Sequence, residues 1–218
     1  MNQENQEAKA ANLAETKLLA SALRLFSEKG YEGTSIREII EGAGVTRPVL
    51  YYYFQNKEDL FCRLVETKFN ELTTEIRNAS ERVQGCKSRL KAIIRTTFML
   101  AENNPEAARL ILQVFFAPPQ QGPPINQAHL GKKRFRLIEE IMRDGLQNKE
   151  LSGGDAQSLA LAFLGIMDMF VMAKYTRPET PLTPELGEGL VELFFHGAEY
   201  REHPPMSLVS PYASAFSS

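Results

Sequence analysis

Residues 33–57 read GTSIREIIEGAGVTRPVLYYYFQNK, and this stretch decides the predicted fold. It holds two short helical patterns separated by a glycine-containing turn. In the first, Ser35 and Glu38 have the spacing of a capping box, in which each side chain satisfies a backbone N–H at the start of a helix. Gly44 is suited to end that helix, because glycine adopts positive φ without a steric penalty. The stretch therefore predicts a helix-turn-helix.

The second helical pattern follows Thr46, which is placed to cap it, and carries Pro48 in its first turn, where a missing N–H costs nothing. Leu50 and Phe54 are four residues apart and predict its buried side. Three consecutive tyrosines, Tyr51–Tyr53, cannot all be buried on so short a helix. An exposed tyrosine offers its hydroxyl to a phosphate and its ring edge to a thymine methyl group. This face suits the major groove of DNA; the alternative is a packing module with half-buried tyrosines.

Three segments together resemble the N-terminal domain of the tetracycline-repressor (TetR) family: GYEGTSI at residues 30–36, AGVT at 43–46 and LYYYFQNKEDL at 50–60. The resemblance implies an all-α homodimer. Its N-terminal three-helix domain would bind a palindromic operator in double-stranded DNA, and its variable C-terminal domain would bind a small inducer.

The same resemblance implies the residues that contact DNA. Base or groove contacts are implied for Arg37, Arg47, Pro48 and Tyr51, phosphate contacts for Tyr52, Tyr53 and Lys57, and positions near the DNA backbone for Thr34 and Ser35, with Thr46 and Val49 on the same surface. Lys57 also fits on physical grounds, because it opens the next helix, where N–H groups and an ammonium can hold one phosphate together. Pro48 stands where many members have Gly, so the operator sequences of those members are a poorer guide to the operator of this protein. Tyr53 stands where His is common, which removes any pH dependence there.

Charge permits DNA binding without proving it. The chain has 218 residues, a formal charge of -2 and a pI of about 6.0, which alone argue against nucleic acid. Between Lys9 and Leu60, seven Lys and Arg residues are balanced by seven Asp and Glu residues. What matters is where the positive charges lie, and Arg37, Arg47 and Lys57 are the ones expected on the groove side.

The remaining chemistry-bearing residues predict neither an enzyme nor a metal or cofactor site. Cys62 and Cys86 lack metal-ligand spacing, and His129 and His196 lie in no metal-binding motif. There is no secretory signal, so a bacterial cytoplasmic protein is expected. The apolar stretch Leu159–Ala173 is interrupted by Asp168 and is too short to span a membrane, so it predicts a buried helix and no membrane partner.

The chain is expected to be all-α, and it divides into four segments. These are a disordered arm at 1–10, the helix-turn-helix domain at 11–56, a helical ligand-binding and dimerisation domain at 57–202, and a disordered tail at 203–218. Beside the helix-turn-helix itself, helices are predicted at 12–29, 57–84, 88–103, 105–117, 126–149, 155–175 and 184–201, with Asn56 as the cap of the second of these and a Pro-rich loop at 118–124.

Aromatic and methionine side chains exceed what one core face needs, which indicates an apolar pocket for a small hydrophobic or aromatic inducer. The alternative for each of them is ordinary core packing. The candidates are Phe98, Met99, Phe115, Phe116, Phe163, Met167 and Phe170.

Helix 155–175 is apolar on nearly all of its surface, so two of its sides must be buried. One side can pack within its own domain and the other against a second subunit, with helix 184–201 completing the dimer interface. Asp168 within it needs a partner, and Arg95 or Arg109 could supply one. An ion pair and a ligand anchor are both possible roles for this carboxylate.

The leading interpretation is a repressor released from its operator by an inducer. A DNA-binding factor that is constitutive or regulated by another protein is the second interpretation. An enzyme built on an α-helical bundle is the third, and it lacks a visible nucleophile, metal or cofactor loop.

Overall fold

The computed structural model describes residues 2–116, 125, 127–152 and 154–196, apart from the side chains of residues 2–12 and 127–129. All regular secondary structure in this part of the chain is α-helical, which confirms the predicted fold class. The helices are α1 (Asn2–Lys29), α2 (Ile36–Ala43), α3 (Arg47–Tyr53), α4 (Lys57–Glu81), α5 (Cys86–Asn103), α6 (Pro105–Phe116), α7 (Gln127–Gln147), α8 (Ala156–Thr176) and α9 (Pro184–His196).

Helix α1 is longer than predicted. It begins at Asn2 and not near residue 12, so residues 2–10, expected to be a disordered arm, are helical. The reason is that Gln, Glu, Ala and Lys are good helix formers and no Gly or Pro interrupts them. Helix α4 is shorter than predicted and ends at Glu81. The loop predicted at 118–124, the last residues of the final predicted helix and the predicted tail lie outside the described residues.

The chain divides into two compact units. The N-terminal unit comprises Met1–Asn70 and Glu106–Gln127, and the C-terminal unit comprises Glu71–Pro105 and Ala128–Ser218. This division differs from the predicted domain boundary at residue 57, because α4 starts in one unit and ends in the other. Most of α6 belongs with α1 to α4: Phe115 packs against Phe69, with ring centroids 5.2 Å apart, and the Gln113 side chain donates to the backbone oxygen of Ser27.

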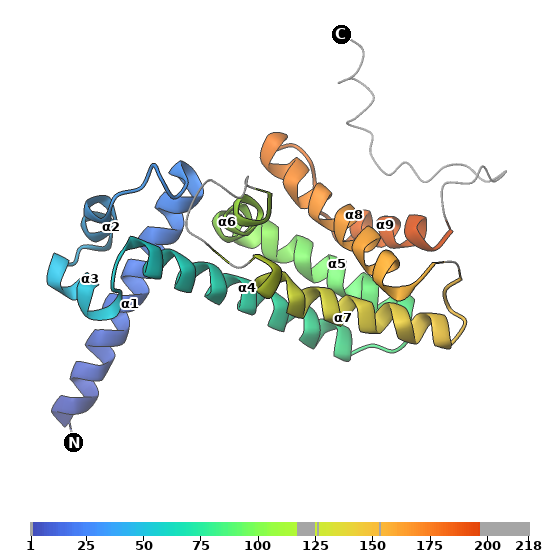
Figure 1. Ribbon diagram of the computed structural model, residues 1–218, viewed down its shortest axis with the longest axis horizontal. Helices are drawn as coiled ribbons and strands as arrows, with labels where there is room; N and C mark the ends of the chain where they lie inside the picture. Colours follow the sequence, from blue (N-terminus) through green and yellow to red (C-terminus); the bar gives the residue numbers. More distant parts are fainter. Residues whose placement is uncertain (1, 117–124, 126, 153, 197–218) are drawn as a thin grey trace, which may run out of the picture. The chain divides into compact units, whose positions relative to one another are not determined.

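In the N-terminal unit, α2 and α3 pack against α1 beside the first turns of α4 (Figure 1). The capping box of α2 is present: Glu38 N donates to Ser35 Oγ at 3.2 Å, and Ser35 N donates to Glu38 Oε2 at 2.9 Å. Gly44 ends α2 with φ 62°, as predicted. Asn56 Oδ1 accepts from Asp59 N and caps α4, also as predicted.

One predicted cap is wrong. Thr46 has the extended backbone of an N-cap residue, but within the described helix α3 its hydroxyl makes no cap hydrogen bond. Pro48 has no backbone N–H, so the first turn of α3 offers the Thr46 hydroxyl one donor fewer. The exposed Thr46 side chain is therefore available to a ligand.

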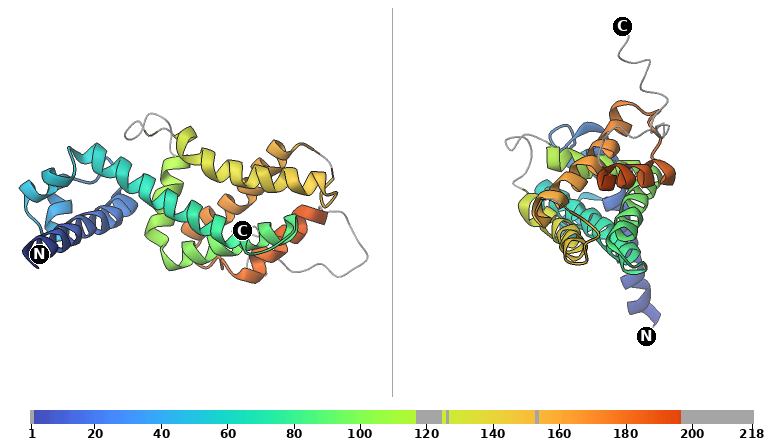
Figure 2. Two further views of the ribbon diagram at one scale, coloured as in Figure 1. Left: turned by 90° about the horizontal axis from the view of Figure 1, so that it is seen from below. Right: turned by 90° about the vertical axis from the view of Figure 1, so that its right-hand side faces the viewer.

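In the C-terminal unit, α5 and α9 pack side by side over much of their length (Figure 2). A glycine permits this close approach, since a Cβ atom at Gly187 would lie 3.2 Å from Ile94 Cγ2 and 3.5 Å from Phe98 Cδ2. The core beside this contact is apolar, and Phe98, Phe163 and Met167 are at most 1% exposed.

Asp168 forms an ion pair, but not with the arginines predicted for it. Arg134 of α7 donates through both of its terminal nitrogens to the two Asp168 oxygens, with Nη1–Oδ1 at 3.0 Å. Arg95 instead pairs with Glu188 of α9. The side chains of Arg134 and Asp168 are only 9% and 18% exposed, so this is a largely buried pair.

Helix α8 is long and apolar enough to cross a membrane by length and composition alone, and 28% of that stretch is buried in the described part of the chain. The interior helix of a water-soluble protein meets the same criteria. Asp168 near its middle is paired with Arg134, and its exposed residues include Leu161 (65% exposed) and Met169 (54%). The chain itself therefore covers one side of α8 and leaves another open.

The buried pair predicts an asymmetric response to mutation. Arg134→Met should destabilise the protein by about 3 kcal/mol, because it leaves the Asp168 carboxylate buried without its charge partner. The double variant Arg134→Met, Asp168→Leu should recover most of this loss. Urea unfolding followed by circular dichroism measures both. Equal losses in the single and double variants would contradict a role for the uncompensated charge.

Candidate nucleic-acid interface

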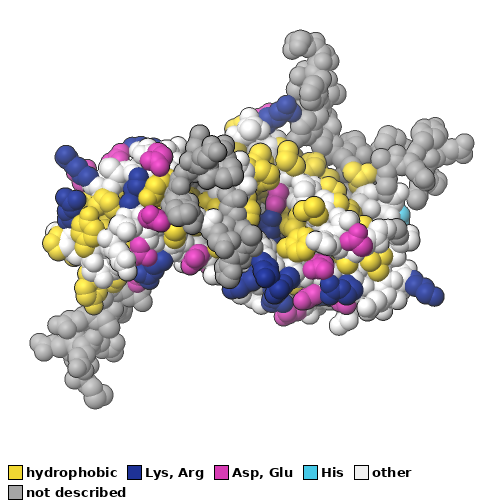
Figure 3. Space-filling model, in the orientation of Figure 1, with side chains coloured by type: hydrophobic (Ala, Val, Ile, Leu, Met, Phe, Trp, Pro, Cys, Tyr) yellow, Lys and Arg dark blue, Asp and Glu magenta, His cyan; other side chains and the backbone are white. Residues whose placement is uncertain are grey.

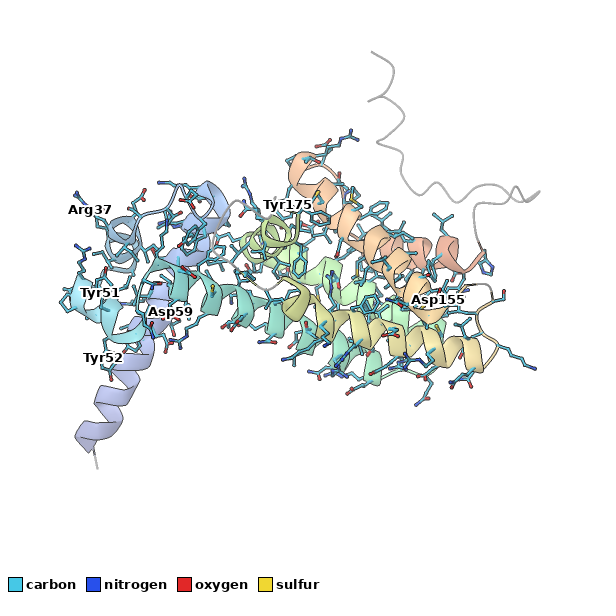
Figure 4. All side chains as sticks on the ribbon, viewed as in Figure 1. Arg37, Tyr51, Tyr52, Asp59, Asp155 and Tyr175 are labelled. Carbon is cyan, nitrogen blue, oxygen red and sulfur yellow. The ribbon has the colours of Figure 1, made fainter. Side chains whose placement is uncertain are left out.

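One side of α3 is buried and the opposite side is open. Leu50 and Phe54 are at most 1% exposed, as predicted, whereas Tyr51 is 45% and Tyr52 79% exposed. Figure 4 shows Tyr51 and Tyr52 of α3 and Arg37 of α2 at the surface of the N-terminal unit. In Figure 3 hydrophobic and positively charged side chains lie next to one another over α2 and α3. A mixed aromatic and basic surface of this kind suits base edges and phosphates.

Arg47 and Tyr51 form the centre of this surface. The Arg47 guanidinium carbon lies 5.7 Å from the Tyr51 ring centroid, within the range of a cation–π contact. Both side chains and Pro48 are exposed, and Val49 is half-buried. Tyr53 is half-buried and packs edge-on against Tyr52. The structure thus brings together the residues predicted for groove contact on α3.

Arg37 is exposed on α2 and is already paired. Its Nε donates to Glu41 Oε1 at 2.7 Å, and this hydrogen bond raises the pKa of the guanidinium. A contact between Arg37 and a base would therefore have to share or break the bond to Glu41.

The start of α2 is fixed by a small charged network. The Lys29 ammonium lies 2.6 Å from Glu38 Oε1 and, together with the Ser35 hydrogen bonds, lowers the pKa of Glu38 to about 2. Glu38 is thus ionised at neutral pH and keeps the capping box closed. The Ser35 hydroxyl is exposed but serves this cap.

Two residues predicted near DNA make hydrogen bonds within the protein. Thr34 is 2% exposed, with its hydroxyl within hydrogen-bonding distance of the Leu25 and Gly30 carbonyls, so its side chain cannot reach a phosphate. The Lys57 ammonium donates to the backbone oxygens of Tyr31 (2.9 Å) and Thr34 (3.1 Å). The position of Lys57 at the start of α4 gave no sign of these carbonyls, because they belong to a turn distant in sequence.

Arg63 of α4 is a functional candidate that sequence reasoning missed. Its Nη1 donates to the Tyr53 backbone oxygen at 2.9 Å, its Nη2 pairs with Glu15 of α1, and its guanidinium lies 5.0 Å from the Phe54 ring centroid. These contacts join α4 to the end of α3. No local pattern marks Arg63, since its partners depend on tertiary packing.

The residues predicted for the inducer pocket are divided between the two units. Phe115 and Phe116 belong to the N-terminal unit, and the other five belong to the C-terminal unit. Phe98, Phe163 and Met167 are buried, Phe115 and Phe170 are half-buried, and Met99 and Phe116 are about half exposed. Among the described residues no group of three or more His, Cys, Asp or Glu side chains could hold a metal ion.

Residues 18–64 match the family model described as bacterial regulatory proteins, tetR family. The transcriptional regulator YezE of Bacillus subtilis is 30% identical over 154 residues, which cover 66% of this chain and 76% of YezE. The chain belongs to the TetR family. The activator FasR of Mycolicibacterium smegmatis is 30% identical over 96 residues, but this match spans only 44% of each chain.

Several solved structures share the fold. FadR from Bacillus subtilis, in complex with stearoyl-CoA, superimposes with a TM-score of 0.74 at 20% identity, covering 84% of this chain and 99% of FadR. AibR, in complex with isovaleryl coenzyme A and operator DNA, gives a TM-score of 0.67 at 24% identity, covering 84% and 98%. These structures show the fold, and the match to the family model places the helix-turn-helix of TetR transcriptional regulators within residues 18–64.

If the open face of α3 reads DNA, removing Arg47 should weaken binding. We expect Arg47→Ala to lower affinity by about 1–3 kcal/mol, or roughly five- to a hundredfold, without loss of fold, because its side chain is exposed. The measurement is a mobility shift on a duplex that the wild-type protein selects from a random-sequence pool. Arg77→Ala, which removes an exposed arginine from the far half of α4, is the matched control. Wild-type affinity in both variants would contradict the assignment.

Proposed function

We propose that this protein is a transcriptional repressor that binds a palindromic operator as a homodimer and is released by a small apolar inducer. The observation that carries the proposal is the exposed face of α3, with Arg47, Tyr51 and Tyr52, on a helix whose other side is buried. Ser35, Thr46, Pro48, Val49 and Tyr53 complete the proposed DNA surface. A bacterial cytoplasmic location follows from this role.

A symmetric dimer explains the open side of α8. Leu161 and Met169 on α8 and Leu193 on α9 are exposed in the single chain, and exposed apolar side chains favour burial against a second copy. Two recognition helices about 34–36 Å apart would then meet successive major grooves of one operator.

Acyl thioesters of coenzyme A are the first candidate inducers. FadR and AibR, whose structures share this fold, were solved with stearoyl-CoA and isovaleryl coenzyme A. The buried aromatic and methionine side chains of the C-terminal unit suit an acyl chain. An inducer of this kind needs only a few kcal/mol of differential affinity to shift the population away from the DNA-binding state.

The dimer proposal predicts the effect of a charge on α8. Leu161→Glu should give a folded monomer, because a carboxylate would be buried without a partner in the dimer seam. Sedimentation velocity measures its mass, and a mobility shift should show at least a tenfold weaker operator complex, since linked half-sites are lost. Gln147→Glu, at an exposed position at the end of α7, should change neither. A dimeric Leu161→Glu protein with wild-type affinity would place the seam elsewhere.

The inducer proposal predicts selective stabilisation by acyl-CoA. A panel of acyl-CoA thioesters from isovaleryl to stearoyl should include a member that raises the melting temperature and dissociates the operator complex, because a ligand that favours the native state stabilises it. Free coenzyme A and the matching free fatty acids are the controls. A protein that binds its operator but responds to no member of the panel would instead support regulation without an acyl-CoA inducer.

FasR is named as an activator, so the sign of regulation needs its own test. A reporter gene placed behind the selected operator should be expressed more strongly when the regulator is deleted. Weaker expression on deletion would show activation and overturn the repressor assignment, while leaving DNA binding intact.

A further inference from the structure

Arg47 is the only charged residue of α3, the helix that presents the proposed DNA surface. It is also the first residue of that helix. In helix-turn-helix proteins the N-terminal residues of the second helix contact base edges in the major groove, while the first helix crosses the DNA backbone. The position of Arg47 therefore favours contact with a base.

The guanidinium of Arg47 keeps its hydrogen-bond donors available. Its carbon lies 5.7 Å from the centroid of the Tyr51 ring, and within the described part of the chain this is its one interaction, with no hydrogen bond or ion pair to it. A cation–π contact uses the face of the guanidinium and leaves the N–H groups at its edge unoccupied. By comparison, Arg37 and Lys57 each donate hydrogen bonds within the protein. Arg47 thus offers a complete fork of donors to a ligand.

The donor fork of an arginine matches one base better than the other three. Guanine presents two acceptors in the major groove, O6 and N7, whereas adenine presents one acceptor and one donor. Thymine presents one acceptor beside its methyl group, and cytosine presents a donor. A guanidinium can donate to both guanine acceptors at once, and this pairing is the commonest specific contact between proteins and DNA. Arg47 therefore has the chemistry of a guanine reader.

Tyr51 restricts the Arg47 side chain before any DNA is bound. The two residues are four positions apart on α3, so their side chains share one face of the helix, and both are exposed. An arginine loses rotamer entropy when a ligand fixes it, and a stack that already exists in the free protein reduces this loss. Tyr51 can thus raise the preference for guanine by acting through Arg47.

We propose that Arg47 reads a guanine in each half of the operator through the O6 and N7 atoms, and that Tyr51 is a positioning residue that holds the guanidinium for this contact. In a symmetric dimer the two guanines lie at equivalent positions on either side of the operator centre. This inference rests on the proposed DNA-binding function and adds the base that the proposed recognition helix selects.

The test removes a single atom from the operator. In the duplex that wild-type protein selects from a random-sequence pool, each guanine and its counterpart in the other half-site are replaced by 7-deazaguanine, which keeps O6 and the base pairing but lacks N7. One such pair of positions should weaken wild-type binding about fivefold or more in a mobility shift. Arg77→Ala, which removes an exposed arginine from the far half of α4, is the control and should show the same loss.

Variants of Arg47 assign that loss to its side chain. Arg47→Ala should not respond to the replacement, because N7 has already lost its partner. Arg47→Gln should select adenine at the same position, since an amide side chain pairs with adenine N6 and N7. A phosphate contact gives a different result: Arg47→Ala would still respond to the loss of N7, and the slope of log K against log salt concentration would fall by about 0.9 for each phosphate. That result, or a selected operator without guanine in its half-sites, would overturn the proposal.

The role of Tyr51 is measured by the size of the loss that 7-deazaguanine causes, and not by affinity alone. Tyr51→Leu removes the ring and should reduce this loss, whereas Tyr51→Phe keeps the ring and should retain it. An undiminished loss in Tyr51→Leu would contradict the positioning role. The measurement on wild-type protein stands even if a variant fails to fold. Wild-type protein that selects no duplex would reject DNA binding itself, which distinguishes failure of the proposed function from failure of this inference.

Discussion

Helix α3, the proposed recognition helix, is too short to be stable by itself, and this constraint governs the whole N-terminal unit. It has seven residues, whereas isolated helices need about 12–15 residues to be even marginally stable in water. Its position is therefore set by its neighbours: Leu50 and Phe54 are buried, and Arg63 binds the Tyr53 carbonyl. The same contacts decide which tyrosines remain exposed. Whatever moves those neighbours also moves the proposed DNA-reading surface.

Helix α4 is the neighbour best placed to do so. It begins in the N-terminal unit, where its first residue holds the turn before α2, and it ends among the residues of the C-terminal unit. Helix α6 adds contacts from Phe115 and Gln113 to α4 and α1. A ligand that alters the C-terminal unit thus has a continuous helix through which to act. Such coupling requires that the ligand bind two arrangements of this helix with different affinity.

Local signals in the sequence were sufficient for the helix-turn-helix. The capping box at Ser35, the positive φ at Gly44 and the buried pair Leu50 and Phe54 depend only on residues a few positions apart. Pairings between helices could not be predicted in this way. Asp168 was expected to pair with Arg95 or Arg109, but its partner is Arg134. Which sides of α7 and α8 face each other depends on tertiary packing, and no local sequence pattern encodes it.

Lys57 illustrates the same limit in the binding site. Its place at a helix N-terminus predicts a phosphate contact, but gave no sign that its ammonium also donates to two carbonyls beside an aromatic ring. Thr34 was likewise predicted near the DNA, and its burial follows from the path of the turn and not from its polarity. Residues on the open face of a helix can be predicted from periodicity, while those in turns require the tertiary structure.

The central claim is that the open face of α3 is the DNA-reading surface. Selective isotope labelling of tyrosine rings tests it most directly, with NMR signals followed as the selected duplex is added. The signals of Tyr51 and Tyr52 should shift on binding, while that of Tyr175 in the C-terminal unit should stay in place. DNA binding that leaves the Tyr51 and Tyr52 signals unmoved would contradict the account.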